Sequence, residues 1–173
     1  HIIKVLVKAN KAQMPSIEEF GHYDWNETNV DLIMLDDSNL TVKTKVIANF
    51  FSKTGADFFG EKLVQRFIEA GYDSIDAILK MTVNQIKKID GVQSTLAEKI
   101  HTNIRIGLTE IELPLLASAT PFFGKNFGYR RMKLIYSKLG QKMFDWSGLT
   151  KGEAVNKIAT IKGFSTETAK QFI

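Results

Sequence analysis

The chain has 173 residues, of which 44% are hydrophobic and 24% charged, so it has enough apolar material for a buried core. It contains no cysteine, which excludes disulfides, a thiol nucleophile and any zinc finger built on cysteine. Residues 1–42 carry three basic and seven acidic side chains, whereas residues 43–173 carry 20 basic and 12 acidic ones. A basic segment of this size suits a polyanion such as nucleic acid; the alternative is a basic surface that binds nothing.

The first 42 residues predict little regular structure. Residues 2–7 are β-branched and apolar around one lysine, which predicts a strand that completes a sheet lying mostly upstream. Residues 8–24 are polar and predict a linker, and the apolar run at residues 30–35 is either a strand or a short packed segment. No signal peptide or membrane span is visible, and the chain lacks an initiator methionine. We therefore expect it to be part of a longer protein.

From residue 43 onward the apolar spacing is helical. Val46, Ile47, Phe50 and Phe51 form one stripe in an expected helix at residues 43–52. Similar stripes occur at residues 61–70, 75–80, 83–89, 95–108, 110–118, 129–139 and 151–160. Capping boxes are expected at Thr82 with Gln85 and at Thr150 with Glu153, N-caps at Ser74 and Ser94, and C-caps at Gly71 and Gly140. This part of the chain is therefore predicted to be all-α.

The helical part repeats a short motif four times. The copies are FFGEK from residue 58, GVQST from residue 91, NFGYR from residue 126 and GFSTE from residue 163. Their central apolar residues, Phe59, Val92, Phe127 and Phe164, are spaced by 33, 35 and 37 residues. Apolar or small residues follow at offsets of five (Val64, Ala97, Met132, Ala169) and eight (Phe67, Ile100, Ile135, Phe172). Each unit is therefore predicted to be a helix, a tight turn and a second helix.

Such a turn predicts an anion site. The apolar residue fills the space between the helices, and the small residues beside it allow positive φ and close approach. The turn opens into a helix N-terminus, whose unpaired amides and positive dipole end suit a DNA phosphate. The alternative is that the glycines only terminate helices. The best site is expected at residues 124–131 and the next at residues 59–62, because Gln93 and Ser165 replace the trailing glycine elsewhere.

The candidate DNA-contacting residues lie in the turns and in the first turn or two of the helices that follow. They are Phe59, Gly60, Lys62, Gly91, Val92, Gln93, Thr95, Lys99, Gly124, Lys125, Asn126, Phe127, Gly128, Tyr129, Arg130, Arg131, Gly163, Phe164, Ser165, Thr166 and Lys170. Contacts of this kind position a duplex without reading its sequence.

A nucleotidyltransferase pattern, KxDG, occurs at residues 88–91. A covalently adenylated lysine needs a sheet-walled pocket that lowers its pKa, but Lys88 ends an amphipathic helix and Gly91 belongs to the second repeat. An enzyme that uses Lys88 is therefore the least favoured hypothesis. No phosphate-cradling GxxxxGK[ST], HExxH or GxSxG motif is present, and no catalytic or metal-ligating residue is assigned.

These motifs resemble the helix-hairpin-helix units of NAD-dependent DNA ligases. Residues 60–64 and 69–71 are similar to the family's GLGEKLVEQLVEAG, and residues 89–93 and 97–100 to its LEGFGEKSAENL. The resemblance covers about 130 residues, in the family's order of four units. Residues 2–5 resemble the last strand of its oligonucleotide-binding (OB) barrel. The resemblance implies the end of that barrel at residues 1–10, a linker at 11–42 and four tandem helix-hairpin-helix repeats at 43–173.

The resemblance also implies a function. The complete protein would seal nicks in duplex DNA during replication or repair, in the cytoplasm of a bacterial, phage or viral system, with NAD and Mg. This chain would hold no cofactor and would grip nicked duplex DNA beside ligase domains that lie upstream. The family's four-cysteine zinc module is absent, and Phe58 replaces the first glycine of unit one. The alternative is a helix-hairpin-helix module of another DNA repair protein without ligase activity.

Overall fold

A computed structural model describes residues 14–26, 32–35, 39–124 and 126–173. The chain divides into two compact units, residues 1–43 and residues 44–173. The strand predicted at residues 2–7, and with it the proposed barrel segment at residues 1–10, lies outside the described residues.

The first unit contains a short helix and a small antiparallel hairpin. Helix α1 (Ile17–Phe20) ends at Gly21 and is followed by strand β1 (Tyr23–Trp25), which pairs with β2 (Leu32–Met34). Tyr23 lies opposite Met34 and Trp25 opposite Leu32. Residues 14–24, predicted as linker, thus contain α1 and part of β1, and β2 lies in the apolar run at residues 30–35.

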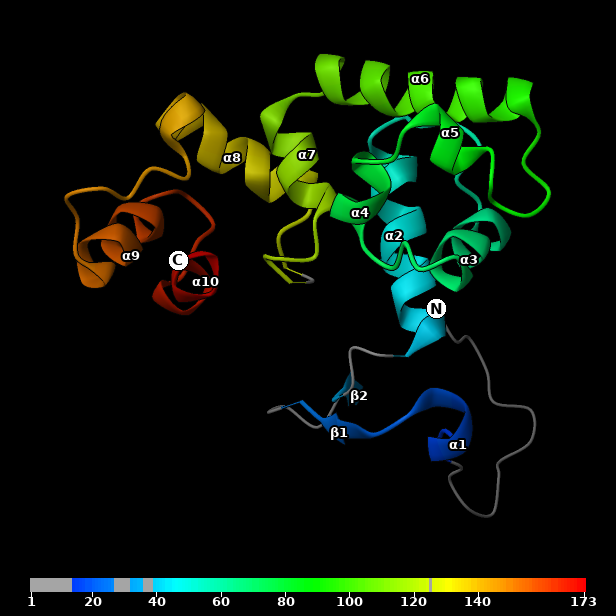
Figure 1. Ribbon diagram of the computed structural model, residues 1–173. Helices are drawn as coiled ribbons and strands as arrows, with labels where there is room; N and C mark the ends of the chain where they lie inside the picture. Colours follow the sequence, from blue (N-terminus) through cyan, green and yellow to red (C-terminus); the bar gives the residue numbers. More distant parts are fainter. Residues whose placement is uncertain (1–13, 27–31, 36–38, 125) are drawn as a thin grey trace, which may run out of the picture. The chain divides into compact units, whose positions relative to one another are not determined.

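The rest of the described chain is helical (Figure 1). In order the elements are α2 (Leu40–Lys53), α3 (Glu61–Glu69), α4 (Ile75–Leu79), α5 (Val83–Ile86), α6 (Ser94–Glu110), α7 (Leu113–Ala119), α8 (Tyr129–Leu139), the 3-10 turn η1 (Gly140–Lys142), α9 (Lys151–Ala159) and α10 (Thr166–Phe172). The prediction of an all-α fold with short N-terminal strands is confirmed.

Most of the predicted caps are present. Both capping boxes form, at α5 and at α9, and the Ser74 hydroxyl accepts a hydrogen bond from the amide of Ala77. The N-cap predicted at Ser94 is wrong, because Gln93 holds that position in extended conformation and Ser94 is the first helical residue.

Two predicted helix boundaries are also wrong. The helix expected at residues 110–118 begins at Leu113, and α6 continues through Glu110. Pro114 explains the break between α6 and α7. Proline has no backbone N–H to donate inside a helix, but the first turn of a helix does not need that donor, so α7 can begin there. The helix expected at residues 83–89 ends at Ile86, and the chain turns from there into the second repeat.

Two apolar clusters hold the helical unit together. The first joins α2 through α6 and contains the fully buried Phe51, Phe67 and Ile100. The second joins α7 through α10 around Phe127 and Ile135. Truncating one such buried phenylalanine to alanine typically costs about 3–5 kcal/mol.

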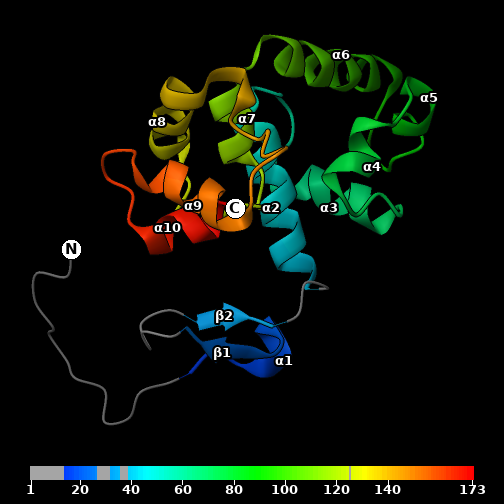
Figure 2. The same cartoon turned by 90° about the vertical axis from the view of Figure 1, so that its left-hand side faces the viewer.

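Helix α7 contributes to both clusters. Its Leu116 and Ala119 pack in the first cluster, and its Leu113 and Ala117 in the second. Figures 1 and 2 show α7 between α2 and α8. We call the hairpins of the first cluster the first pair and those of the second cluster the second pair.

Candidate nucleic-acid interface

The repeated motif forms the turn of each hairpin. Turn one (58–60) joins α2 to α3, turn two (91–93) leads from α5 into α6, turn three (126–128) joins α7 to α8, and turn four (163–165) joins α9 to α10. Phe59, Val92, Phe127 and Phe164 are buried, and so are all the residues at offsets five and eight from them. The predicted role of these apolar residues as plugs between helices is confirmed. Their side chains point into the core, so only their main chain is available to a ligand.

The leading residue of three turns has positive φ. The values are 70° at Gly91, 92° at Gly163 and 76° at Phe58, which is the one non-glycine residue with positive φ among the described residues. Turn three differs, because its positive φ falls at Gly124 (70°), two residues before the aligned position. Glycine reaches this conformation freely, whereas an L-residue with a bulky side chain is strained in it.

The trailing residue of each turn has ordinary extended backbone. Gly60, Gln93, Gly128 and Ser165 are the N-caps of the four following helices, with φ between −66° and −85°. The prediction that small residues beside the apolar residue allow positive φ thus holds at the leading Gly91 and Gly163 but not at the trailing Gly60 and Gly128. A Cβ built on Gly60 or Gly128 meets no atom within 4 Å, and both residues are exposed. Neither conformation nor internal packing requires glycine at these two positions.

Gly60 and Gly128 leave the first backbone amides of α3 and α8 without a hydrogen-bond acceptor. Within the described part of the chain, the amides of Glu61 and Lys62 on α3 and of Tyr129 and Arg130 on α8 have no acceptor. Gly60 and Gly128 offer no side chain to cap them. Two or more such amides at the positive end of a helix form a site for an anion.

Turn four differs in its cap and its charge. The Ser165 hydroxyl accepts a hydrogen bond from the amide of Thr168, the third of α10, at 3.1 Å. The amides of Thr166 and Glu167 have no acceptor among the described residues, as at α3 and α8. Glu167 adds an acidic group in the first turn of α10, and the Lys170 ammonium pairs with it at 3.2 Å. A seven-residue helix with a serine cap and its own carboxylate is a poor anion site, and Thr166 lies beside that carboxylate.

Turn two gains a basic group that the sequence did not indicate. Arg66, on α3, donates from Nη1 to the carbonyl of Asp90 at 3.2 Å. Its guanidinium lies over Gly91, where a Cβ would collide with it. The first turn of α6 holds no acidic residue, and Gln93 makes no side-chain cap. This turn, expected to be weak, therefore has a guanidinium beside it and no acidic residue in the first turn of its helix, whereas the helix of turn one begins with Glu61 and Lys62.

Turn three is the most basic, and its two arginines have different roles. Arg130 is exposed and has no partner among the described residues. Arg131 is half-buried and donates from Nη1 to the carbonyl of Asn126 at 3.1 Å, so it braces the turn. The side-chain amide of Asn126 donates a hydrogen bond to the side-chain oxygen of Gln171, on α10, at 3.1 Å. Lys125 lies outside the described residues.

Tyr129 braces α8 against α7. Its hydroxyl donates to Glu112, the N-cap of α7, at 2.9 Å and accepts from the Lys133 ammonium at 3.2 Å. This hydrogen bond from Lys133 to Tyr129 raises the pKa of the lysine, which stays charged at neutral pH. The predicted DNA contact at Tyr129 thus competes with a bond inside the protein.

The packing brings turns together within each pair. The Phe127 and Phe164 rings lie 6.3 Å apart, so turns three and four are neighbours. Arg66 joins α3, which follows turn one, to turn two. The candidate residues exposed beside the plugs are Gly60, Lys62, Gly91, Gln93, Thr95, Lys99, Gly124, Asn126, Gly128, Tyr129, Arg130, Gly163, Ser165, Thr166 and Lys170.

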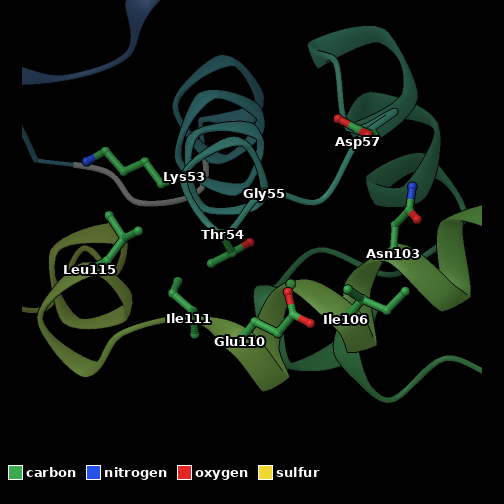
Figure 3. A pocket seen from close by; sticks show the side chains of 10 residues that line it. Lys53, Thr54, Gly55, Asp57, Asn103, Ile106, Glu110, Ile111 and Leu115 are labelled. Carbon is green, nitrogen blue, oxygen red and sulfur yellow. The ribbon is translucent and has the colours of Figure 1, made fainter.

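Other features of the described residues offer less. A hollow of about 400 Å³ lies between the end of α2, α6 and the start of α7 (Figure 3). Asp57 and Glu110 line it with only one lysine, Lys53, so it is poorly suited to phosphate. The described residues hold no group of three or more side chains suited to a metal, and none of their helices is long and apolar enough to cross a bilayer. Lys88 is exposed next to helical segments rather than walled by a sheet.

Comparison with known proteins places these turns in context. Residues 58–105 match a family model described as a SAM-like helix-hairpin-helix tandem. Over an alignment of 174 positions that covers all of this chain, the sequence is 32% identical to a protein named DNA ligase from Acanthamoeba polyphaga mimivirus. The chain spans about a quarter of that relative's length, 27%. No solved structure matches the chain.

Proposed function

We propose that residues 44–173 bind duplex DNA through its phosphates, without sequence preference, as the DNA-gripping part of a DNA ligase. The observation that carries this proposal is the pair of open glycine N-caps. Gly60 and Gly128 are needed neither for backbone conformation nor for packing inside the chain, yet each uncovers the amides of a helix. A phosphate that approaches these amides is a sufficient reason for a missing side chain.

Charge and similarity support the same proposal. The 20 basic side chains of residues 43–173 exceed the acidic ones by eight, which favours a polyanion. The tandem helix-hairpin-helix match covers turns one and two, and the 32% identical relative carries the name DNA ligase. The complete protein would seal nicks in duplex DNA with NAD and Mg, through domains outside this chain. The described residues hold no group of three or more side chains suited to a metal, and no step of the reaction is assigned to them.

A substitution at Gly128 tests the phosphate site directly. Gly128→Asp introduces a good N-cap and a negative charge near the helix dipole, so the folded chain should be at least as stable as the wild type. The same charge repels phosphate and occupies the amides. Charge-assisted hydrogen bonds contribute about 1.5–3 kcal/mol each, so affinity for duplex DNA should fall by roughly tenfold or more.

Fluorescence titration with labelled duplexes of several sequences measures the affinity, and thermal melting measures the stability. Gly128→Asn supplies an uncharged cap of the same size, and Gly152→Ala changes an exposed glycine of α9 that also has open space around it. We expect Gly152→Ala to bind like the wild type and Gly128→Asn to lie between the wild type and Gly128→Asp. Unchanged affinity of Gly128→Asp would overturn the phosphate site.

The alternative function is the same grip in another DNA repair protein. The observation that favours it is that the helix-hairpin-helix match describes a fold and no reaction. Incubating the full-length protein with labelled NAD or ATP, followed by denaturing gel analysis, separates the two. A ligase forms a covalent adenylate, and NAD but not ATP should supply it. A protein that binds nicked DNA but forms no adenylate with either nucleotide is the alternative.

A further inference from the structure

One basic side chain of the first pair reaches from one turn to the other. Arg66 lies in α3, the helix that follows turn one, and its Nη1 donates a hydrogen bond to the carbonyl of Asp90 at 3.2 Å. Asp90 directly precedes Gly91, the leading residue of turn two, and the guanidinium lies over Gly91. A side chain of the first hairpin thus forms part of the surface of the second turn.

The contact with Asp90 uses only part of the guanidinium. An arginine has five N–H donors, and among the described residues the Asp90 carbonyl is the one acceptor that Arg66 meets. Within the same residues no carboxylate forms an ion pair with Arg66, and its side chain is exposed. The other donors and the positive charge therefore remain available to a ligand from outside the chain.

Lys62 lies on the same face of α3 as Arg66. Residues four apart are neighbours on a helix surface, with Cβ atoms about 5–6 Å apart. Lys62 and Arg66 are both exposed, whereas Val64 and Phe67 of the same helix are buried. We call Lys62 and Arg66 the α3 basic stripe. It begins at the uncovered amides beside turn one and ends over Gly91 at turn two, so it connects the two turns along one helix face.

The nearby acidic side chains do not neutralise this stripe. Glu98 of α6 pairs with the Lys87 ammonium at 3.5 Å, and Glu69 of α3 accepts a hydrogen bond from Gln65 at 3.0 Å. Glu61 precedes Arg66 by five positions, which places it about 140° around the helix from Arg66. Among the described residues, the α3 basic stripe therefore keeps its two charges unpaired.

The chemistry of the stripe suits a row of phosphates. The planar guanidinium matches the oxygens of a phosphate or a carboxylate in a bidentate manner. The excess of eight basic side chains in residues 43–173 favours the polyanion over an acidic protein segment. Because the Asp90 carbonyl already holds one donor of Arg66, less side-chain freedom is lost when a phosphate binds.

We propose that Arg66 binds a DNA phosphate at turn two and that, together with Lys62, it makes the two turns of the first pair one continuous contact with the DNA backbone. This inference rests on the proposed DNA binding and adds a phosphate-binding residue that lies outside the repeated motif. The competing role is that of a brace, in which Arg66 only holds the backbone of turn two through Asp90.

The test is fluorescence titration of the 173-residue chain with labelled duplex DNA between about 50 and 200 mM salt. Arg66→Ala should weaken binding roughly tenfold and reduce the slope of log K against log salt by about one. Arg66→Lys keeps the charge but not the planar fork, so it should keep the slope of the wild type and lose part of the affinity.

Arg105→Ala is the matched control. Arg105 is also an exposed arginine, but it lies about three helical turns beyond the start of α6, so its removal changes the net charge equally without touching turn two. It should bind nearly like the wild type. Should Arg66→Ala fail to fold, as judged by thermal melting, Arg66→Gln replaces it, because glutamine lacks the charge but retains a donor. The same loss of slope is expected.

A brace and a phosphate contact give different results. If Arg66 is only a brace, the salt slope stays at the wild-type value in every variant and any loss of affinity follows the melting temperature. That result, or an effect of Arg66→Ala no larger than that of Arg105→Ala, overturns the inference. The proposed function then still stands on Gly128→Asp, which acts at turn three. If the wild type does not bind duplex DNA, the proposed function and this inference fail together.

Discussion

Single residues of the four turns have distinct physical roles that their shared motif conceals. Gly91 requires glycine for its positive φ, and the flexible end of the Arg66 side chain lies over it. Gly60 has neither a positive φ nor a neighbour that a Cβ would meet, so nothing inside the chain requires glycine there. This is why we look outside the chain, to a ligand, for its role. Arg130 is available to a phosphate, whereas Arg131 is committed to the Asn126 carbonyl.

Phe58 permits a prediction about strain. Its φ of 76° lies in the region that L-residues avoid at roughly 1–2 kcal/mol. Phe58→Gly and Phe58→Ala both lack the phenyl group, so the difference in their stabilities reports the backbone conformation alone. We expect the glycine variant to be more stable by about 1 kcal/mol, although glycine is usually the less stable of the two. Urea unfolding measures the difference; a more stable alanine variant would contradict the strained conformation.

At the scale of elements, short helices depend on their caps. Helix α5 has four residues and α9 has nine, and each begins with a complete capping box. Helices α3 and α8 follow glycine N-caps and lack this support. The helices that are open to an anion are thus the ones that give up local stabilisation, which a bound phosphate would restore.

The two capping boxes permit a prediction about pH. Hydrogen bonds from the side chain and the backbone of Thr150 lower the pKa of Glu153 below its ordinary value of 4.5. A carboxylate with a lowered pKa stabilises the fold above 4.5, and this contribution is lost as the pH falls through the folded value. Gln85 holds the same position in the box of Thr82 and does not titrate.

Thr150→Ala should therefore destabilise the chain more at pH 7 than at pH 3, while Thr82→Ala should cost about 1 kcal/mol at both. Urea unfolding of both variants and the wild type at the two pH values measures this. Equal pH dependence of the two variants would contradict the assigned role of the Glu153 carboxylate.

At the scale of the whole molecule, basic charge and open helix ends combine unequally over the four turns. Turn three has both, turn two has a basic group from Arg66, and the helix of turn one begins with an acidic residue. Turn four has a serine cap on the third amide of its helix and an acidic residue in the first helical turn. A duplex bound by these turns would depend most on turn three.

This inequality permits a prediction about salt. Arg130→Ala should weaken binding to all sequences alike and reduce the slope of log K against log salt by about one. Lys170→Ala removes the same charge at turn four, but that lysine is paired with Glu167, so its effect should be much smaller. Fluorescence titrations between about 50 and 200 mM salt compare the two. If Arg130→Ala and Lys170→Ala reduce the affinity and the salt slope equally, turns three and four contribute equally to DNA binding.

The sequence by itself determined the local features of this protein. Apolar spacing predicted the helices, and the recurrence of Phe59, Val92, Phe127 and Phe164 predicted four plugged turns, because both depend on residues close together in the chain. The resemblance to ligases added the candidate function, and the family match and the viral relative support it.

Only the tertiary structure decided how the turns differ. The approach of Arg66 to Gly91, the contact of Phe127 with Phe164 and the sharing of α7 between two clusters join residues that are far apart in sequence. Such contacts depend on how helices pack, which helical periodicity does not specify. The exposure of Phe122 is of the same kind, because it depends on which side chains pack around the turn between α7 and α8.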